Sequence, residues 1–232
     1  MIQAMAIFSI ADLHLDSGGK PMDVFGEQWK DHAERIFLCW REMVTDQDIV
    51  LLPGDLSWAM RLEDAVPHLE WIGSMPGTKL ILRGNHDYWW SSLSRVRDML
   101  PARMFAIQND SMMIDGTLFA GTRGWLLPGE EQTPADEKVY LRELMRLSLS
   151  LKSARARSED APLVVMMHYP PLTKDRLQTG FTEILQAHRA DHVVYGHLHG
   201  ASLKGAFRGC SEGIEYHQVS ADGLDFQLKR IL

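Results

Sequence analysis

Cysteine is scarce in this chain: Cys39 and Cys210 are the only two among 232 residues. Two cysteines cannot form the disulfide framework of a small secreted domain, which favours a reducing, cytoplasmic location. Apolar runs are also short, and none approaches the ~20 residues that a membrane helix needs. Asp12 interrupts the N-terminal apolar run too early for a signal peptide, so we expect no membrane partner.

Positive charge is lacking as well. The formal net charge is −7, and no block of five or more like charges occurs. Proteins that bind nucleic acid gain affinity by neutralising phosphates with Lys and Arg, so this balance disfavours nucleic acid as a partner and disfavours a nuclease. A small phosphorylated substrate needs only a local positive site, so the negative net charge does not exclude it. No G-x-S-x-G, P-loop or G-x-G-x-x-G motif is present.

The composition is that of an ordinary globular protein, with 45% hydrophobic and 24% charged residues. No linker, repeat or low-complexity segment divides the chain. We therefore expect one domain over residues 1–232, a length that a single core can absorb.

Apolar runs bounded by Gly, Pro or polar residues predict strands that are buried on both faces. The runs cover residues 6–11, 49–53, 79–83, 163–167 and 192–195. Apolar residues at a period of 3.6 predict helices over residues 27–44, 62–72, 91–100 and 135–157, with Pro67 opening a new helical turn. Shorter strands are predicted at 104–107, 111–114, 118–121, 214–219 and 224–228. Asp115-Gly116 is the strongest hairpin signal, and residues 221–223 join the last two strands.

Candidate metal ligands follow the five long apolar runs. They are Asp12 and His14, Asp55, Asn85, His168, and His197 and His199. Side chains at the ends of neighbouring strands converge at one edge of a sheet. Carboxylate, amide and imidazole groups together suit Mn²⁺, Fe²⁺ or Zn²⁺, and the absence of thiolates argues against a purely structural zinc site.

Each segment taken alone has a second interpretation. Asp12 and His14 lie two residues apart, which puts both side chains on one side of an extended strand, but a capping Asp and a surface His would look the same. Asp55 could be a helix N-cap. Asp87 could orient His86 or cap a helix that begins near Tyr88, and the pattern favours the cap.

Taken in order, the segments D-x-H, G-D, G-N-H-D, H and G-H-x-H resemble the calcineurin-like metallophosphoesterases. The resemblance extends from Asp12 to His199. Within the superfamily, the sequences of residues 21–26 and 53–58 resemble those of a group of bacterial predicted phosphohydrolases. It implies an α/β fold: a four-layer α/β/β/α sandwich of two mixed β-sheets flanked by helices.

The resemblance also implies two divalent metal ions, with Mn²⁺ first and Fe or Zn²⁺ as alternatives. Asp12, His14 and His199 would hold one ion, and His168 and His197 would complete the second. Asp55 would bridge both ions, and Asn85 would be a neutral ligand. His86 would act as a general acid or as a charge stabiliser while a metal-bound hydroxide attacks phosphorus.

The chain departs from the Ser/Thr phosphatases of this superfamily, which read G-D-x-x-D-R-G at the second motif. Trp58 and Ala59 stand here in place of the second Asp and the Arg. Loss of the phosphate-clamping Arg counts against a phosphoprotein phosphatase and favours phosphodiesters or nucleotide-like substrates. Trp58, Arg123 and Trp125 are candidate substrate-binding residues, although a Trp that packs in the core would fit the same pattern.

We therefore expect a dinuclear phosphoesterase that hydrolyses small phosphate esters. The alternative is a catalytically silent metal-binding or protein-interaction module on the same scaffold, which would typically have lost His86 or several ligands. The sequence indicates neither the leaving group nor the choice between mono- and diester, and it leaves the metal and the oligomeric state open.

Overall fold

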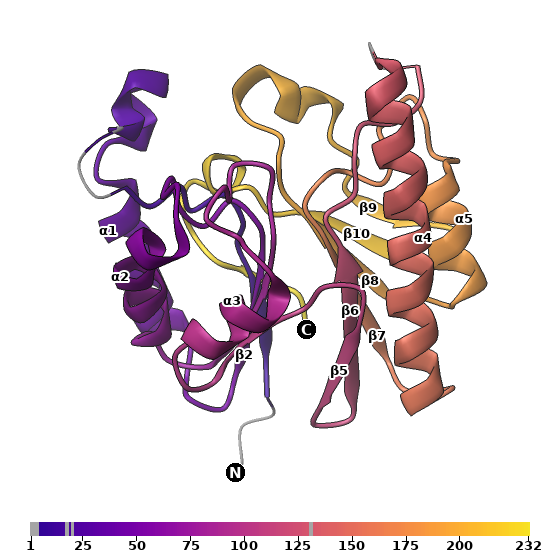
Figure 1. Ribbon diagram of the computed structural model, residues 1–232, viewed down its shortest axis with the longest axis horizontal. Helices are drawn as coiled ribbons and strands as arrows, with labels where there is room; N and C mark the ends of the chain where they lie inside the picture. Colours follow the sequence, from indigo (N-terminus) through magenta and orange to yellow (C-terminus); the bar gives the residue numbers. More distant parts are fainter. Residues whose placement is uncertain (1–4, 17–18, 20, 130–131) are drawn as a thin grey trace.

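The computed structural model describes residues 5–16, 19, 21–129 and 132–232. Two mixed β-sheets lie face to face, with helices on the outer face of each (Figure 1). The five-stranded sheet has the order β11-β1-β2-β3-β4, and the six-stranded sheet has the order β5-β6-β7-β8-β10-β9. This is the four-layer α/β/β/α sandwich expected from the sequence.

The first sheet contains β1 (Ile7–Ser9), β2 (Ile49–Pro53), β3 (Thr78–Leu82), β4 (Met104–Ala106) and β11 (Lys229–Arg230). The second contains β5 (Ser111–Ile114), β6 (Thr117–Thr122), β7 (Leu163–Met167), β8 (His192–Tyr195), β9 (Gly209–Ser211) and β10 (Ile214–Gln218). Strands β1 to β4 are parallel, as are β6, β7, β8 and β10, whereas β11, β5 and β9 run antiparallel to their neighbours.

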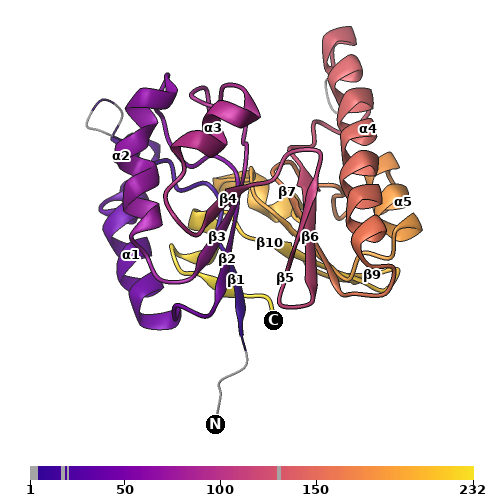
Figure 2. The same ribbon diagram turned by 60° about the horizontal axis from the view of Figure 1, so that its bottom comes forward.

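The helices are α1 (His32–Met43), α2 (Leu62–Gly73), α3 (Leu93–Met99), α4 (Pro134–Arg157) and α5 (Gly180–Ala187). Helices α1 and α2 cover the first sheet, and α4 and α5 cover the second (Figure 2). None of these helices has the length and apolar character needed to cross a bilayer, as far as the described residues extend.

Alternate residues of the strands enter different cores, which explains their continuous apolar runs. In β2, Val50 and Leu52 pack under the helices of the first sheet. Ile49 and Leu51 point the other way and meet Phe119 of β6 between the sheets. A strand whose two faces are both buried needs apolar side chains at every position.

Several predicted elements are confirmed to the residue. The runs at 49–53, 163–167 and 192–195 are β2, β7 and β8. The hairpin joins β5 and β6, with Ile114 opposite Thr117. Asp115 and Gly116 have φ of 46° and 81°, the two left-handed residues that a two-residue turn of the favoured hand requires.

The first strand is shorter than the run at 6–11 predicts. After Ser9 the chain leaves the first sheet, and Ala11 forms a parallel bridge with Ser220, just beyond β10 of the second sheet. The Ala11 N–H donates to the carbonyl of Val219 at 2.8 Å. This crossing carries Asp12 to the junction between the two sheets.

Two other expectations about these elements are wrong. Pro67 lies inside a continuous α2 and opens no new turn, because the buried face of that helix, which includes Leu62 and Leu69, holds it against the sheet. Residues 224–228 form no strand: a 3-10 helix, Ala221–Leu224, follows β10, and the chain then crosses to the first sheet as β11. The sequence reading also missed α5 and β9.

Candidate metal centre

The seven predicted ligand residues meet in one cluster, beyond the carboxyl ends of β1, β2, β3, β7 and β8. His168 Nε2 lies 3.4 Å from Asp55 Oδ2 and 2.6 Å from Asn85 Oδ1. The same Asn85 oxygen lies 2.9 Å from His197 Nδ1. Three further pairs are His14 Nε2 with Asp55 Oδ2 at 3.9 Å, His168 Nδ1 with Asp12 Oδ1 at 3.9 Å, and His199 Nε2 with Asp12 Oδ1 at 3.6 Å.

Two overlapping sets of these side chains could each hold an ion. In each set, one nitrogen or oxygen atom per residue lies within 4.8 Å of the others. The first set is Asp12, His14 and His199, the grouping expected for the first ion. The second is Asp12, Asp55 and His168, so Asp12 is common to both sets. Two adjacent cation positions follow, and the assignment of the bridging role to Asp55 stays a prediction.

Left-handed backbone conformations aim four of these side chains at the cluster. The φ values are 60° for Asp12, 45° for His14, 55° for Asp55 and 71° for His197. The expectation that Asp12 and His14 share one side of an extended strand is therefore wrong, since β1 has ended at Ser9. Such conformations cost roughly 1–3 kcal/mol each and persist only where the surrounding contacts hold them, which occurs most often at functional sites.

Glycines leave room for the ligands. A Cβ atom at Gly84 would lie 2.0 Å from Asp55 Oδ1, and one at Gly196 would lie 2.5 Å from Asp12 Oδ2. A Cβ atom at Gly54 would lie 2.7 Å from His168 Nδ1. These contacts give a steric reason for the glycine that precedes a ligand in each of three motifs.

Buried negative charge makes the cluster a fit for cations. Asp12, Asp55 and Asp87 are all buried. Burial, followed by the neighbouring charges of Asp87 and Asp12, raises the pKa of Asp55 well above its usual value. Divalent ions would compensate this charge.

The imidazoles also present lone pairs to the cluster. His168 Nδ1 lies 3.0 Å from the carbonyl oxygen of Pro53, an acceptor, which places the ring proton on Nδ1. Nε2 then carries no proton, and its lone pair, 2.6 Å from the side-chain oxygen of Asn85, is available to a cation. His14 Nδ1 is buried and has no hydrogen-bond partner among the described residues. The residues present therefore fit a divalent metal pair.

Asp87 does not cap a helix, contrary to expectation, because α3 begins only at Leu93. Its carboxylate accepts hydrogen bonds from the backbone N–H groups of Gly84 and Asp55, at 2.7 and 2.8 Å. It also accepts from Leu56 N–H and from the indole of Trp89, both at 2.9 Å. Asp87 thus fastens the turn after β3 to the turn after β2, and so positions Asn85 and Asp55 relative to each other.

Sequence reasoning missed two residues behind the ligands. Asp222 Oδ1 lies 2.9 Å from His199 Nδ1, which leaves Nε2 of that ring facing Asp12. Tyr169 packs on His197, with ring centroids 3.9 Å apart. Partners of this kind hold a ligand ring in one orientation. Asp222 precedes Gly223 and looked like a turn residue, so no local signal marked it.

His86 lies beside the ligand cluster, in a cavity of about 320 Å³. The ring of Trp58 stacks on His14 at 4.7 Å and lies 4.7 Å from the ring of His86. Trp58 is half-buried and also packs against the core under α1 and α2. It is therefore both a wall of the cavity and a packing residue of the core. The cavity is lined by His14, Met22, Phe25, Gln28, Trp29, Trp58, His86, His199, Gly200 and Asp222.

Arg123 and Trp125, the other candidate substrate-binding residues, do not line this cavity. The guanidinium of Arg123 lies over the ring of Trp125 at 4.4 Å and 3.8 Å from the carboxylate of Glu143. Trp125 packs near Tyr169, with ring centroids 5.0 Å apart. Both therefore lie on the Tyr169 side of the metal centre, whereas Trp58 lies on the His14 side.

Comparison with known proteins agrees with this geometry. The family model described as calcineurin-like phosphoesterase matches residues 5–201, and the chain belongs to that family. No curated protein matches the chain. The chain is similar to the crystal structure of a protein of unknown function from Aquifex aeolicus, with a TM-score of 0.53 and 14% sequence identity. The match covers 97% of this chain and 95% of the Aquifex chain. That likeness shows the fold alone.

Proposed function

We propose that this protein is a dinuclear metal-dependent phosphoesterase that hydrolyses small phosphate esters, with a preference for phosphodiesters or nucleotide-like compounds. The observation that carries the proposal is the convergence of all seven ligand residues with His86 beside them. A silent module that had lost catalysis would have no reason to keep His86 and every ligand position. The oxygen- and imidazole-rich ligand set favours Mn²⁺, with Fe or Zn²⁺ as alternatives.

The metal pair would supply an activated water and would stabilise the charge of an in-line displacement at phosphorus. The chain's own residues would do the rest. The Asp12 and Asp55 carboxylates, the Asn85 amide and the four histidines would hold the ions, and Asp87 fixes the turns that carry Asp55 and Asn85. His86, held through its backbone N–H on Asp55 Oδ1 at 2.7 Å, would give a proton to the departing oxygen or stabilise the phosphoryl oxygens.

The cavity beside His86 supports an apolar or aromatic leaving group. Met22, Phe25, Trp29 and Trp58 give it apolar and aromatic walls, while His14 and His199 connect it to the ligand cluster. An aromatic wall can stack on any nucleobase or aryl group, because each of these presents a flat π face. The absence of an Arg at the position of Ala59 leaves less to hold a dianionic monoester there, which favours a monoanionic diester.

The test is His86→Asn in the Mn²⁺-loaded protein, assayed on bis(p-nitrophenyl) phosphate, on p-nitrophenyl phosphate and on a diester with a poor leaving group. We expect two metals per chain, a near-native melting temperature, and a kcat reduced by roughly 10²–10⁴-fold. The loss should shrink for good leaving groups if His86 donates a proton, and should be uniform if it stabilises charge. His188→Asn, at the C-cap of α5 and outside the ligand cluster, is the matched control. Undiminished activity, or loss of metal with the imidazole, would sink the assignment.

A further inference from the structure

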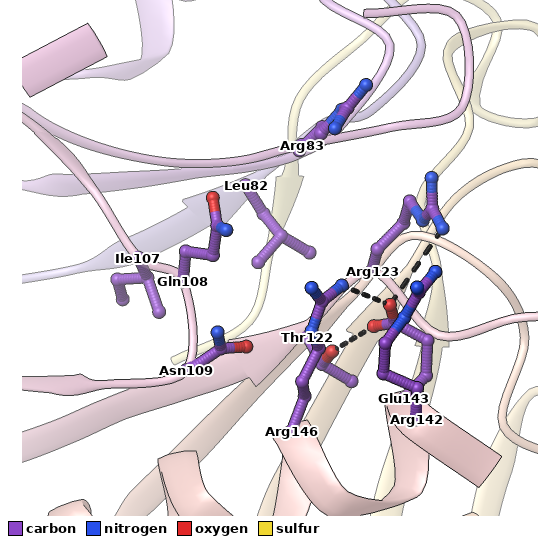
Figure 3. A pocket seen from close by; sticks show the side chains of 10 residues that line it. All are labelled: Leu82, Arg83, Ile107, Gln108, Asn109, Thr122, Arg123, Arg142, Glu143 and Arg146. Atoms are coloured by element: carbon purple, nitrogen blue, oxygen red, sulfur yellow. Dashed lines mark hydrogen bonds and ion pairs between the residues drawn. The ribbon is translucent and has the colours of Figure 1, made fainter. Parts of the chain in front are cut away.

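A second cavity lies beside the metal centre and collects arginine side chains. It has a volume of about 190 Å³ and is bounded by the ends of β3 and β6, the segment between β4 and β5, and α4. Arg83 directly follows β3 and Arg123 directly follows β6, whereas Arg142 and Arg146 come from α4 (Figure 3). We call this cavity the arginine pocket; its other lining residues are Leu82, Ile107, Gln108, Asn109, Thr122 and Glu143.

The positive charge of the arginine pocket is not compensated. Glu143 is the only acidic residue among its lining residues, and it is fully buried. Its carboxylate pairs with Arg146 at 2.7 Å and with Arg123 at 3.8 Å, and accepts a hydrogen bond from the hydroxyl of Thr122. The lining thus contains four guanidinium groups and one carboxylate, an excess of three positive charges in a protein whose net charge is −7.

Arg83 gives the strongest indication that this pocket suits an anion. Within the described part of the chain it forms neither a hydrogen bond nor an ion pair, and its Nε atom is buried without a partner. Arg123 Nε is buried and unpartnered in the same way. Confining such donors in a cavity beside other guanidinium groups costs free energy unless an anion completes the set.

We propose that the arginine pocket binds a phosphate group other than the one that is hydrolysed. Guanidinium groups pair with phosphate oxygens through two parallel hydrogen bonds, and several of them around one cavity match the charge of a phosphate better than that of a carboxylate. The cavity far exceeds the ~10–15 Å³ that a single water requires, so a group of five heavy atoms fits.

The pocket and the metal centre are built on the same turns. Arg83 enters the pocket, and two residues later Asn85 enters the metal centre. The carbonyl of Arg123 accepts the N–H groups of His168 and Tyr169, at 3.1 and 2.9 Å. The bound phosphate could therefore be a second phosphate of the substrate or free phosphate from solution. In either case the recognising chemistry is the same.

The test counts bound phosphate by equilibrium dialysis of radiolabelled inorganic phosphate against the metal-loaded protein. The variant is Arg83→Gln with Arg142→Gln, two residues that form no ion pair among the described residues. Each charge-assisted hydrogen bond that is lost weakens binding by about ten-fold or more. We expect the wild type to hold one more phosphate per chain than this variant. Arg41→Gln with Arg95→Gln, on α1 and α3, removes the same charge elsewhere and should keep the wild-type number.

The difference between wild type and variant tests the arginine pocket, and the phosphate that remains reports the metal centre. If the proposed function fails and the metals bind no phosphate, we expect one bound phosphate per chain in the wild type and none in the double variant. That result still supports the arginine pocket as a phosphate site. Equal counts for wild type and variant, or an equal loss in the control, overturn the proposal. Arg142→Gln alone, at an exposed site on α4, gives the same test if the double variant does not fold.

The source of the phosphate follows from kcat/KM on two p-nitrophenyl diesters, one of which carries an additional terminal phosphate. If the double variant is impaired at least ten-fold only on that ester, the pocket receives a phosphate of the substrate. If both esters react as with the wild type while the phosphate count still falls by one, the pocket takes up free phosphate. Both outcomes uphold the pocket as a phosphate site.

Discussion

At the scale of single residues, the side chains that gather at the candidate site could be predicted from the sequence, but their geometry could not, and their roles as metal ligands stay a prediction. The five motifs identify Asp12, Asp55 and the histidines, because order and residue type together are hard to reproduce by chance. The left-handed conformations of Asp12 and His14 could not be predicted, since neither residue is a glycine. Their cost is met by tertiary contacts, such as the Asp12 N–H on the Gly54 carbonyl at 3.0 Å, and no local pattern reveals those contacts.

Replacing Asp55 by Ala should remove both metals together. Its carboxylate lies between His14 and His168, at 3.9 and 3.4 Å, where a ligand can reach both ion positions. His14→Ala should weaken mainly one ion, because His14 belongs to one of the two ligand sets. Metal analysis of the purified variants decides the matter. Two ions per chain in Asp55→Ala would show that Asp55 is not the bridge.

Trp58→Ala should raise KM more than it lowers kcat. The ring forms a wall of the cavity, stacks on His14 and lies at a tilt beside His86, but no proton transfer requires it. A base stacked on an aromatic side chain contributes about 1–3 kcal/mol, which sets the expected rise in KM at roughly 5–150-fold for an aromatic ester. Trp58→Phe should recover most of the affinity. A fall in kcat with KM unchanged would contradict this role.

At the scale of elements, the apolar runs predicted the long buried strands because both faces of those strands need the same kind of residue. Elements that depend on distant partners were missed or misplaced. Helix α5 is only eight residues long and begins with a glycine, so its pattern is short and its propensity weak. Residues 221–224 form a 3-10 helix that holds Asp222 against His199 and the N–H of Gly200, which lie more than twenty residues away in the sequence.

One element is held by a buried lysine. Lys79 of β3 is 2% exposed, and its ammonium donates to the carbonyls of Gly73, Met75 and Gly77 at 3.0, 2.6 and 2.9 Å. Burial lowers its pKa to about 8, so the group is still protonated at neutral pH. These three hydrogen bonds hold the loop between α2 and β3 in place.

Lys79→Met should therefore destabilise the protein, because it keeps the apolar stem but leaves three carbonyls without their donor. An unsatisfied buried polar group costs about 1–3 kcal/mol, and relief of the buried charge offsets part of the sum, so we expect a loss of about 2–4 kcal/mol. Urea unfolding at pH 7 measures it. Lys152→Met, at an exposed position on α4, should stay within about 0.5 kcal/mol of wild type. Equal stability of the two variants would show that the carbonyls find other partners.

At the scale of the whole molecule, the two sheets are joined by the last residues of the chain. After β10 in the second sheet, β11 pairs antiparallel with β1 in the first, with Phe8 opposite Arg230. Leu228 is buried under the helices of the first sheet, and Ile231 is buried between the two sheets. The sequence did not predict the crossing, because a two-residue strand carries no periodicity.

Deleting residues 228–232 should weaken the fold and the metal centre together. The deletion removes two buried apolar side chains, worth about 1.5–3 kcal/mol each, and turns β1 into an unpaired edge strand. We expect a loss of about 3–6 kcal/mol in the free energy of unfolding. Because β1 leads directly to Asp12 and His14, metal affinity should fall as well, and saturating Mn²⁺ should restore part of the stability by binding only the folded state. Arg230→Gln, which keeps the backbone of β11, is the control and should unfold like the wild type. If the shortened chain matches the wild type in urea midpoint and metal content, β1 is stable without β11 as a neighbour. The two sheets are then held together by the apolar layer between them, to which β2, β3, β6 and β7 contribute.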